Sequence, residues 1–149
     1  GGVEVVPSIK KIIDAGIPVM GHIGLMPQSI NKYGTYALRA NNEEEASKLR
    51  SDAKALEEAG CYAIVIEKVP AVLAAEVAKS VSIPIIGIGA GSGADGQVLV
   101  MHDMLGINMD FSPKFLRRYA NLNQVISEAV VNYINDVKSG DFPNENEQY

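Results

Sequence analysis

The chain has 149 residues, of which 47% are hydrophobic, and this length allows one domain that can bury roughly 70% of its unfolded surface. Its formal net charge is −5 and its 13 basic residues form no run longer than Arg117-Arg118, which argues against a nucleic-acid partner or an anionic membrane surface. A single cysteine, the lack of a long apolar stretch and the lack of a visible signal peptide predict a soluble protein of the reducing cytoplasm.

Helical and strand patterns alternate along most of the chain. Apolar residues recur at spacings of three and four in the helical segments, whereas the strand segments are short apolar runs bounded by glycine or proline. The predicted elements are a helix over residues 7–16, a strand over 17–22, a helix over 43–59, a strand over 61–67, a helix over 71–80, a strand over 83–89 and a helix over 121–139. Residues 97–100 fit either a further short strand or the start of a helix, and the polar tail over 141–149 is expected to be ordered only by a neighbour.

This alternation predicts a parallel α/β structure. Three strands are well defined and a fourth is possible, whereas a closed barrel of βα units has eight. Parallel strands are normally covered by helices on both faces or closed into a ring. We therefore expect residues 1–149 to form a single partial domain, equivalent to about strands 5–8 of such a barrel, followed by a C-terminal helix and the polar tail.

The predicted strand over residues 61–67 ends on a carboxylate, Glu67, which Lys68 and Pro70 follow. Its apolar run shows no alternation, which favours a strand buried on both faces. In α/β folds the side chains at the carboxyl ends of the strands line the active site, so Glu67 is the first candidate catalytic residue. The alternative is an exposed loop glutamate that pairs with Lys68.

The two histidines of the chain are further candidates. His22 lies at the end of the first predicted strand, so it is expected on the same rim as Glu67 if both strands belong to one sheet. An imidazole can donate to a substrate oxygen or take a proton near neutral pH, and the equally good alternative is a histidine that orients its loop. His102 adjoins Asp103, but neighbours in sequence do not face each other, so we expect a structural role for His102.

The loop over residues 89–96 is rich in glycine and follows a strand. Its backbone amides could bind an anion, but the acidic residue that a dinucleotide-binding fingerprint requires about twenty positions later has no clear candidate. The glycines are equally explained by a tight turn beside a bound substrate. No metal site is predicted within the chain, because Asp95, Asp103 and Asp110 are scattered without ligand spacing and paired Cys or His are lacking.

Five stretches taken together resemble the ketopantoate hydroxymethyltransferase family. They are PVMGHIGLMPQ at residues 18–28, AKALEEAG at 53–60, IVIEKVP at 64–70, IGIGAG at 86–91 with DGQVLV at 95–100, and SPKF at 112–115. The resemblance follows the chain in order over essentially all of its length. It implies a (βα)8 TIM barrel of the phosphoenolpyruvate/pyruvate type, of which this chain is the C-terminal half.

The resemblance also implies a reaction in the pathway to pantothenate and coenzyme A. A hydroxymethyl group passes from 5,10-methylenetetrahydrofolate to 3-methyl-2-oxobutanoate, giving 2-dehydropantoate, with Mg²⁺ as cofactor. On the positions that match the family, Glu67 is the general base and His22 lies in the substrate pocket, where it binds the 2-oxo acid. A homo-oligomer is implied as well.

The chain departs from the family at its N-terminal end. Family members are longer, and their metal-binding aspartates and substrate-binding lysine belong to earlier strands, so we expect the Mg²⁺ ligands in the missing N-terminal half. The chain alone is expected to be inactive and to need that half of the same protein as its partner. Two alternatives remain open: a non-catalytic half-barrel that serves as an oligomerisation module, and a related barrel lyase that acts on another 2-oxo acid.

Overall fold

The structure is a computed structural model that describes residues 1–149, apart from the side chains of Lys32 and Tyr33. Contacts along the chain cluster within two compact units, Gly1–Val98 and Leu99–Tyr149. The sequence predicts one partial domain over the same residues. In the structure the first unit holds the sheet and the second holds the C-terminal helix.

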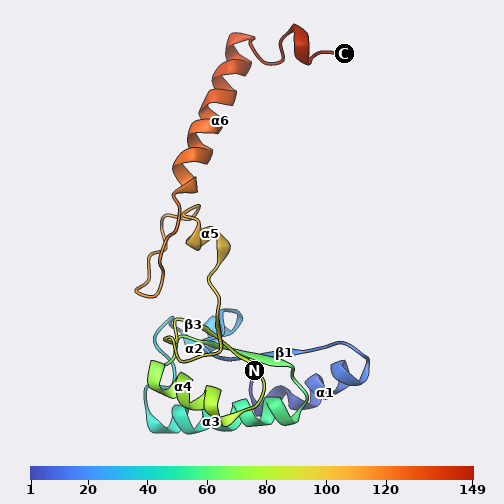
Figure 1. Cartoon of the computed structure of the whole chain (residues 1–149), viewed down its shortest axis with the longest axis vertical. Coiled ribbons are helices and arrows are strands. Elements are labelled where there is room, and N and C mark those ends of the chain that lie inside the picture. Colours follow the sequence, from blue (N-terminus) through green and yellow to red (C-terminus); the bar gives the residue numbers. More distant parts are fainter. The chain divides into compact units, whose positions relative to one another are not determined.

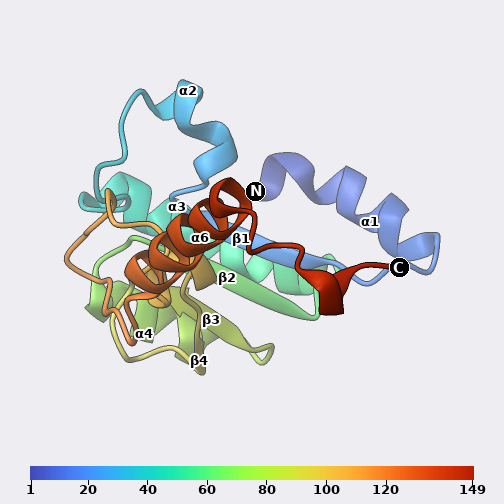
Figure 2. The same cartoon turned by 90° about the horizontal axis from the view of Figure 1, so that it is seen from above.

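A parallel sheet of four strands forms the first unit, in the order β1-β2-β3-β4. The strands are β1 (Met20–Gly24), β2 (Ala63–Glu67), β3 (Ile85–Ile88) and β4 (Gly96–Gln97). Figure 2 shows them side by side in chain order. The predicted parallel α/β arrangement is confirmed, and both interpretations of residues 97–100 are partly right, because the two-residue β4 is followed by helix α5 (Met101–Met104).

The first strand is the element whose bounds the sequence predicted least well. It was expected over residues 17–22, but β1 begins at Met20 and ends at Gly24. Pairing with β2 decides the bounds, since it starts at Met20 opposite Ala63. Pro18 has no backbone N–H to donate to a ladder, so the pattern around it could not set the start.

Helices α1 (Val6–Asp14), α2 (Ile30–Tyr33), α3 (Glu43–Glu58) and α4 (Ala71–Ser80) complete the first unit, with two short turns, η1 (Val3–Val5) and η2 (Pro27–Ser29). Helix α3 begins after Asn42, whose side chain accepts a hydrogen bond of 2.9 Å from the Glu45 N–H. The bounds of α4 are those predicted. Helix α2 was not predicted, because four residues are too few to show a helical period.

The core lies between the sheet and helices α3 and α4, which lie on one side of it (Figure 1). The largest fully buried side chains are Leu56, Ile64, Ile66, Val69, Val77 and Ile85. Alternate strand residues point to the opposite face, where Val65 and Ile86 are only half-buried. Burial of β2 on both faces was therefore wrong for the residues described: both faces carry apolar side chains, but helices cover one. The half-buried face is the one that carries His22 and Glu67.

Glu57, on the last turn of α3, hydrogen-bonds to Ser82 in the segment that leads into β3. Its Oε1 accepts hydrogen bonds from the Ser82 N–H at 2.6 Å and from the Ser82 Oγ–H at 2.5 Å. These bonds lower the pKa of the Glu57 carboxyl below its usual value of 4.5. The bond from the Ser82 hydroxyl has the largest effect, and the bond from the Ser82 N–H comes second. A depressed pKa in the folded state contributes stability that is present above the unfolded pKa and is lost as the pH falls through the folded pKa.

A Glu57→Gln variant is therefore expected to melt at a lower temperature than wild type near neutral pH. The difference should close as the pH falls below 4.5 and through the lowered pKa of Glu57, because protonation then removes the wild-type advantage. Thermal unfolding followed by circular dichroism over this range measures it. Glu58→Gln is the matched control, since Glu58 is exposed one residue further along the helix. A difference between wild type and Glu57→Gln that does not change with pH would contradict the prediction.

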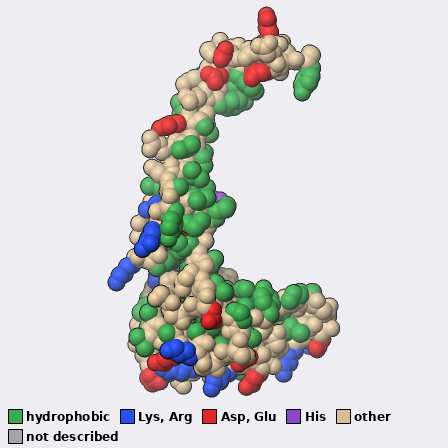
Figure 3. Space-filling model, viewed as in Figure 1, with side chains coloured by type: hydrophobic (Ala, Val, Ile, Leu, Met, Phe, Trp, Pro, Cys, Tyr) green, Lys and Arg blue, Asp and Glu red, His purple; other side chains and the backbone are tan. Residues whose placement is uncertain are grey.

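The second unit is dominated by α6 (Leu122–Ser139), with α5 before it and the short turn η3 (Glu145–Glu147) after it. The helix ends at Gly140, whose φ of +81° gives a left-handed cap. Apolar side chains that are 41–58% exposed run along α6 (Figure 3): Val125, Ile126, Val130, Val131, Tyr133, Ile134 and Val137. No helix in the part of the chain that the structure describes combines the length and apolar composition needed to cross a membrane.

Candidate active site

Glu67 is the last residue of β2, where strands on both sides fix its backbone. Its register partners are Gly24 on β1 and Ile88 on β3. The Leu25 N–H donates to the Glu67 carbonyl at 2.8 Å, and the Lys68 N–H donates to the Ile88 carbonyl at 2.9 Å. The Glu67 side chain is 15% exposed, so the carboxylate is sheltered at the carboxyl end of the sheet.

His22 contacts Glu67 from the neighbouring strand. It lies in the middle of β1, opposite Val65, and not at the strand end as predicted. Because side chains alternate along a strand, residues 22 and 24 share the face of residues 65 and 67. The His22 Nε2 and Glu67 Oε2 atoms are 3.1 Å apart.

The direction of the hydrogen bond between these two side chains depends on the tautomer of His22. An ionised carboxylate only accepts, so with Glu67 ionised the His22 Nε2–H is the donor. Among the residues that the structure describes, only His22 hydrogen-bonds to the Glu67 carboxylate, which leaves Oε1 open to a bound molecule. The alternative pairing of Glu67 with Lys68 is not observed, because the Lys68 Nζ donates to the Tyr36 carbonyl.

Gly24 allows β1 to approach β2 beside Glu67. Its φ is +85°, and a Cβ at this position would lie 2.2 Å from the Glu67 carbonyl oxygen and 2.9 Å from the Val69 Cγ1. Only glycine fits such an approach. Gly24 is not among the residues predicted for the site, although its place just after a predicted strand is a signal in the sequence.

A cavity of about 260 Å³ adjoins the edge of β1. Its lining residues come from the chain start, β1, the segment before α3 and α3 itself: Gly1, Gly2, Glu4, His22, Ile23, Gly24, Met26, Arg39, Ala40, Glu45, Lys48, Leu49 and Asp52. The volume is slightly below the usual range of ligand pockets, which suits a molecule of few heavy atoms. His22 thus faces Glu67 with its ring while it forms part of the cavity wall.

The charged residues of the cavity wall are largely paired with one another. The Lys48 Nζ lies 2.9 Å from the Asp52 Oδ2 and 3.1 Å from the Glu4 Oε1, and the Asp52 Oδ1 accepts from the Val3 N–H at 3.1 Å. The hydrogen bond that the Lys48 ammonium donates to the Asp52 carboxylate is the main cause of the raised pKa of Lys48. This cluster is not predicted from the sequence, because only the Lys48–Asp52 spacing of four is visible without the fold.

The residues present do not fit a Mg²⁺ site by themselves. Mg²⁺ requires an octahedron of oxygen ligands, usually including one or two carboxylates. In the described part of the chain no three His, Cys, Asp or Glu side chains gather as metal ligands. Glu45 and Asp52, which line the cavity, each already bind a cationic side chain and a backbone N–H.

The glycine-rich loop packs closely on α4. A Cβ at Gly91 would lie 2.4 Å from the Ala71 Cβ, and one at Gly93 would lie 2.5 Å from the Ala75 Cβ. The Gln97 Nε2–H donates to the Gly91 carbonyl at 2.9 Å and closes the loop. These contacts support the interpretation of the glycines as a tight turn, because they explain the glycines without a bound anion.

His102 and its neighbour Asp103 lie on α5 in the second unit. Asp103 is buried and accepts a hydrogen bond of 3.1 Å from the Asn108 Nδ2–H, whereas the His102 side chain is exposed. The His102 carbonyl accepts from the Ile107 N–H at 2.8 Å. The structural role expected for His102 stays a prediction.

The sequence over residues 1–145 matches the family described as ketopantoate hydroxymethyltransferase. The chain belongs to the ketopantoate hydroxymethyltransferase family. This family has the TIM barrel of the phosphoenolpyruvate/pyruvate type, and the parallel sheet of the chain with its helices is the C-terminal half of that barrel.

Curated relatives of the ketopantoate hydroxymethyltransferase family align with the chain from end to end. Proteins named 3-methyl-2-oxobutanoate hydroxymethyltransferase are 65% identical in Phocaeicola vulgatus, 68% in Parabacteroides distasonis and 65% in Christiangramia forsetii. Each alignment covers 100% of this chain and 55% of the relative. The chain therefore spans about half the length of the curated relatives it matches.

Proposed function

We propose that the chain is the C-terminal half of an enzyme that transfers a hydroxymethyl group from 5,10-methylenetetrahydrofolate to 3-methyl-2-oxobutanoate, giving 2-dehydropantoate. Family membership supports the reaction class. The observation that carries the proposal is the hydrogen bond of 3.1 Å between His22 and Glu67, on a sheltered part of the sheet next to a cavity. A carboxylate held in this way suits proton abstraction next to a carbonyl group.

In the proposed reaction the Glu67 carboxylate takes the proton from C3 of 3-methyl-2-oxobutanoate through its open oxygen, Oε1. The electron pair of the broken C–H bond moves into the C2–C3 bond, and the carbonyl becomes an enolate. C3 then forms a bond to the methylene carbon of the folate, and water supplies the hydroxyl group of the product. The two C–N bonds of that carbon break, and tetrahydrofolate leaves with two protons on its nitrogens, one from C3 by way of Glu67 and one from the water. His22 keeps the carboxylate oriented throughout, because its Nε2–H holds Oε2.

We place the Mg²⁺ ligands in the N-terminal half of the same protein, because the side chains that the structure describes in this chain do not gather into a set that fits the ion. The two edges of the sheet support pairing with that N-terminal half. The outer strands of the sheet are β1 and β4, and the open edge of β1 accepts a hydrogen bond of 2.8 Å from the Gly1 nitrogen to the His22 carbonyl. Further strands that pair with these edges would close the barrel. The chain alone would then be inactive, and the complete enzyme would work in the cytoplasm.

Exchange of the C3 proton tests the proposed function. Full-length protein with Mg²⁺ should catalyse deuterium incorporation at C3 of 3-methyl-2-oxobutanoate in D2O, followed by nuclear magnetic resonance. It should form 2-dehydropantoate when 5,10-methylenetetrahydrofolate is added. No exchange would contradict the proposal and favour a non-catalytic module, whereas cleavage of another 2-oxo acid would favour a lyase.

The apolar stripe of α6 supports a homo-oligomer. Side chains such as Val130 and Tyr133 are 50% and 55% exposed, and an interface would remove them from water. We expect Val130→Glu to lower the mass of the full-length protein, measured by light scattering after size-exclusion chromatography. Asn132→Glu is the matched control, because it adds the same charge to a polar position of the helix. An unchanged mass in Val130→Glu would mean that the stripe is not at a subunit interface.

A further inference from the structure

Lys68, the residue after Glu67, has a left-handed backbone. Its φ is +50°, and in the described chain the other non-glycine residue with a positive φ is Ala40, at +52°. The Cβ of an ordinary residue disfavours this conformation, so it persists only where surrounding contacts impose it. Backbone strain of this kind often lies beside functional groups.

Two segments impose the conformation of Lys68 through its backbone. The Lys68 N–H donates to the Ile88 carbonyl on β3 at 2.9 Å, and the Lys68 carbonyl accepts from the Arg39 N–H at 3.0 Å. The residue therefore bridges the sheet and the segment that precedes α3. The peptide that follows Glu67 is held from both sides as a result.

The side chain of Lys68 binds the same segment at a second point. Its Nζ donates to the Tyr36 carbonyl. At its other end the segment is held by Glu45 on α3, whose Oε2 accepts from the Ala40 N–H at 2.6 Å and whose Oε1 accepts from the Arg39 Nη2–H at 2.7 Å. We name residues 36–40 the docking segment, because Lys68 binds it at Tyr36 and Arg39 and Glu45 binds it at Arg39 and Ala40.

Two residues of the docking segment line the cavity beside β1. Arg39 and Ala40 line the cavity that His22 and Gly24 also line. Ala40 is 5% exposed and packs into the core, so its position depends on how the segment is attached. A single residue, Lys68, thus connects the backbone that carries Glu67 to a wall of the cavity.

We propose that Lys68 is a positioning residue for proton abstraction by Glu67. By docking residues 36–40 against the carboxyl end of β2, it fixes the direction of the Glu67 carboxylate and the adjoining cavity wall together. This inference rests on the proposed function, because it assigns Lys68 a part in the step that Glu67 performs. Lys68 itself does not contact the Glu67 carboxylate in the structure, since its Nζ is bound to Tyr36.

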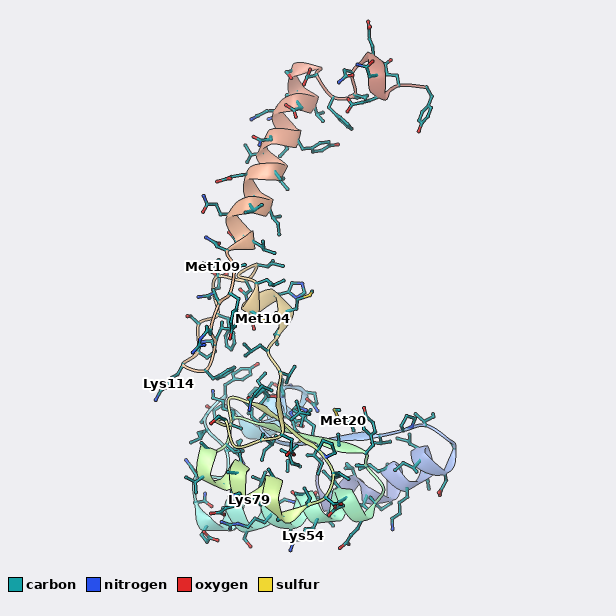
Figure 4. All side chains as sticks on the ribbon, viewed as in Figure 1. Met20, Lys54, Lys79, Met104, Met109 and Lys114 are labelled. Carbon is teal, nitrogen blue, oxygen red and sulfur yellow. The ribbon has the colours of Figure 1, made fainter. Side chains whose placement is uncertain are left out.

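The test compares three variants of the full-length protein: Lys68→Met, Lys68→Arg and Lys79→Met. Lys68→Met keeps an unbranched stem but removes the Nζ donor, and Lys68→Arg keeps a donor. Lys79→Met removes the same charge from an exposed position of α4, the helix on which Figure 4 labels Lys79. The measurements are kcat and KM for C3 proton exchange, and the hydrogen–deuterium exchange of the backbone amides in residues 36–40.

Lys68→Met is expected to lower kcat by about 10- to 100-fold with KM little changed, and to speed amide exchange in the docking segment. Lys68→Arg should restore most of kcat, and Lys79→Met should behave as wild type. A wild-type kcat in Lys68→Met would overturn the inference. So would a rise in KM alone, which would indicate a substrate contact, or a fall in kcat with unchanged amide exchange in residues 36–40.

Failure of this inference is distinguishable from failure of the proposed function. If Glu67→Gln abolishes C3 exchange while Lys68→Met is fully active, Glu67 remains the base and only the role of Lys68 is wrong. If Glu67→Gln retains exchange, the proposed step itself is wrong. Both results come from the same exchange assay.

Discussion

Replacement of Glu67 by glutamine in the full-length protein is expected to lower the rate of C3 proton exchange by about 10²- to 10⁴-fold, the range that a positioned general base contributes. Glutamine has nearly the same shape and its amide oxygen can still accept the hydrogen bond from the His22 Nε2–H. It cannot take up a proton near neutral pH. The loss would therefore report the missing base and not a rearranged site.

Three further measurements make the Glu67 result specific. Thermal unfolding of Glu67→Gln should stay close to wild type, because the side chain is sheltered but still partly exposed. Glu58→Gln, the same change at an exposed position of α3, should leave exchange unaltered. His22→Ala should lower the rate less than Glu67→Gln, since it removes only the group that orients the carboxylate. Exchange within about threefold of wild type in Glu67→Gln would remove Glu67 from the mechanism.

Substitution of alanine for Gly24 is expected to destabilise the full-length protein by about 3–5 kcal/mol and to abolish exchange. A left-handed φ of +85° disfavours any Cβ, and the new atom would lie 2.2 Å from the Glu67 carbonyl oxygen. That carbonyl accepts the Leu25 N–H that holds β1 to β2, so relief of the clash would separate the strands at Glu67. Urea unfolding measures the stability, and the exchange assay measures the site.

Gly16→Ala is the matched control for Gly24→Ala. Gly16 has a φ of +83°, almost the same as that of Gly24, but no atom lies within 4 Å of the position of its Cβ. Its substitution should cost only the conformational term, about 1–2 kcal/mol, and should leave exchange unchanged. Equal losses of stability in the two variants would show that β1 does not approach Glu67 as closely as the structure has it.

Local patterns in the sequence predicted the elements that depend on local signals. Helix α4 and the end of β2 at Glu67 fall where the sequence places them, because a helical period and an unbroken apolar run are readable over ten residues or fewer. Helix α2 was missed because it is too short for a period. His22 was placed at a strand end because the bounds of β1 depend on its pairing with β2, which no local pattern contains.

The sequence by itself determined the alternation of helices and strands and the carboxylate at the end of β2, because both follow from patterns among neighbouring residues. It also determined the family, because the family motifs occur in order along the chain. Only the tertiary structure decided which groups meet that carboxylate. His22 and Glu67 are 45 positions apart, and Lys68 and Tyr36 are 32 apart. Contacts over such separations follow from the parallel register and from the packing of α3 and α4, which set distances that sequence spacing does not.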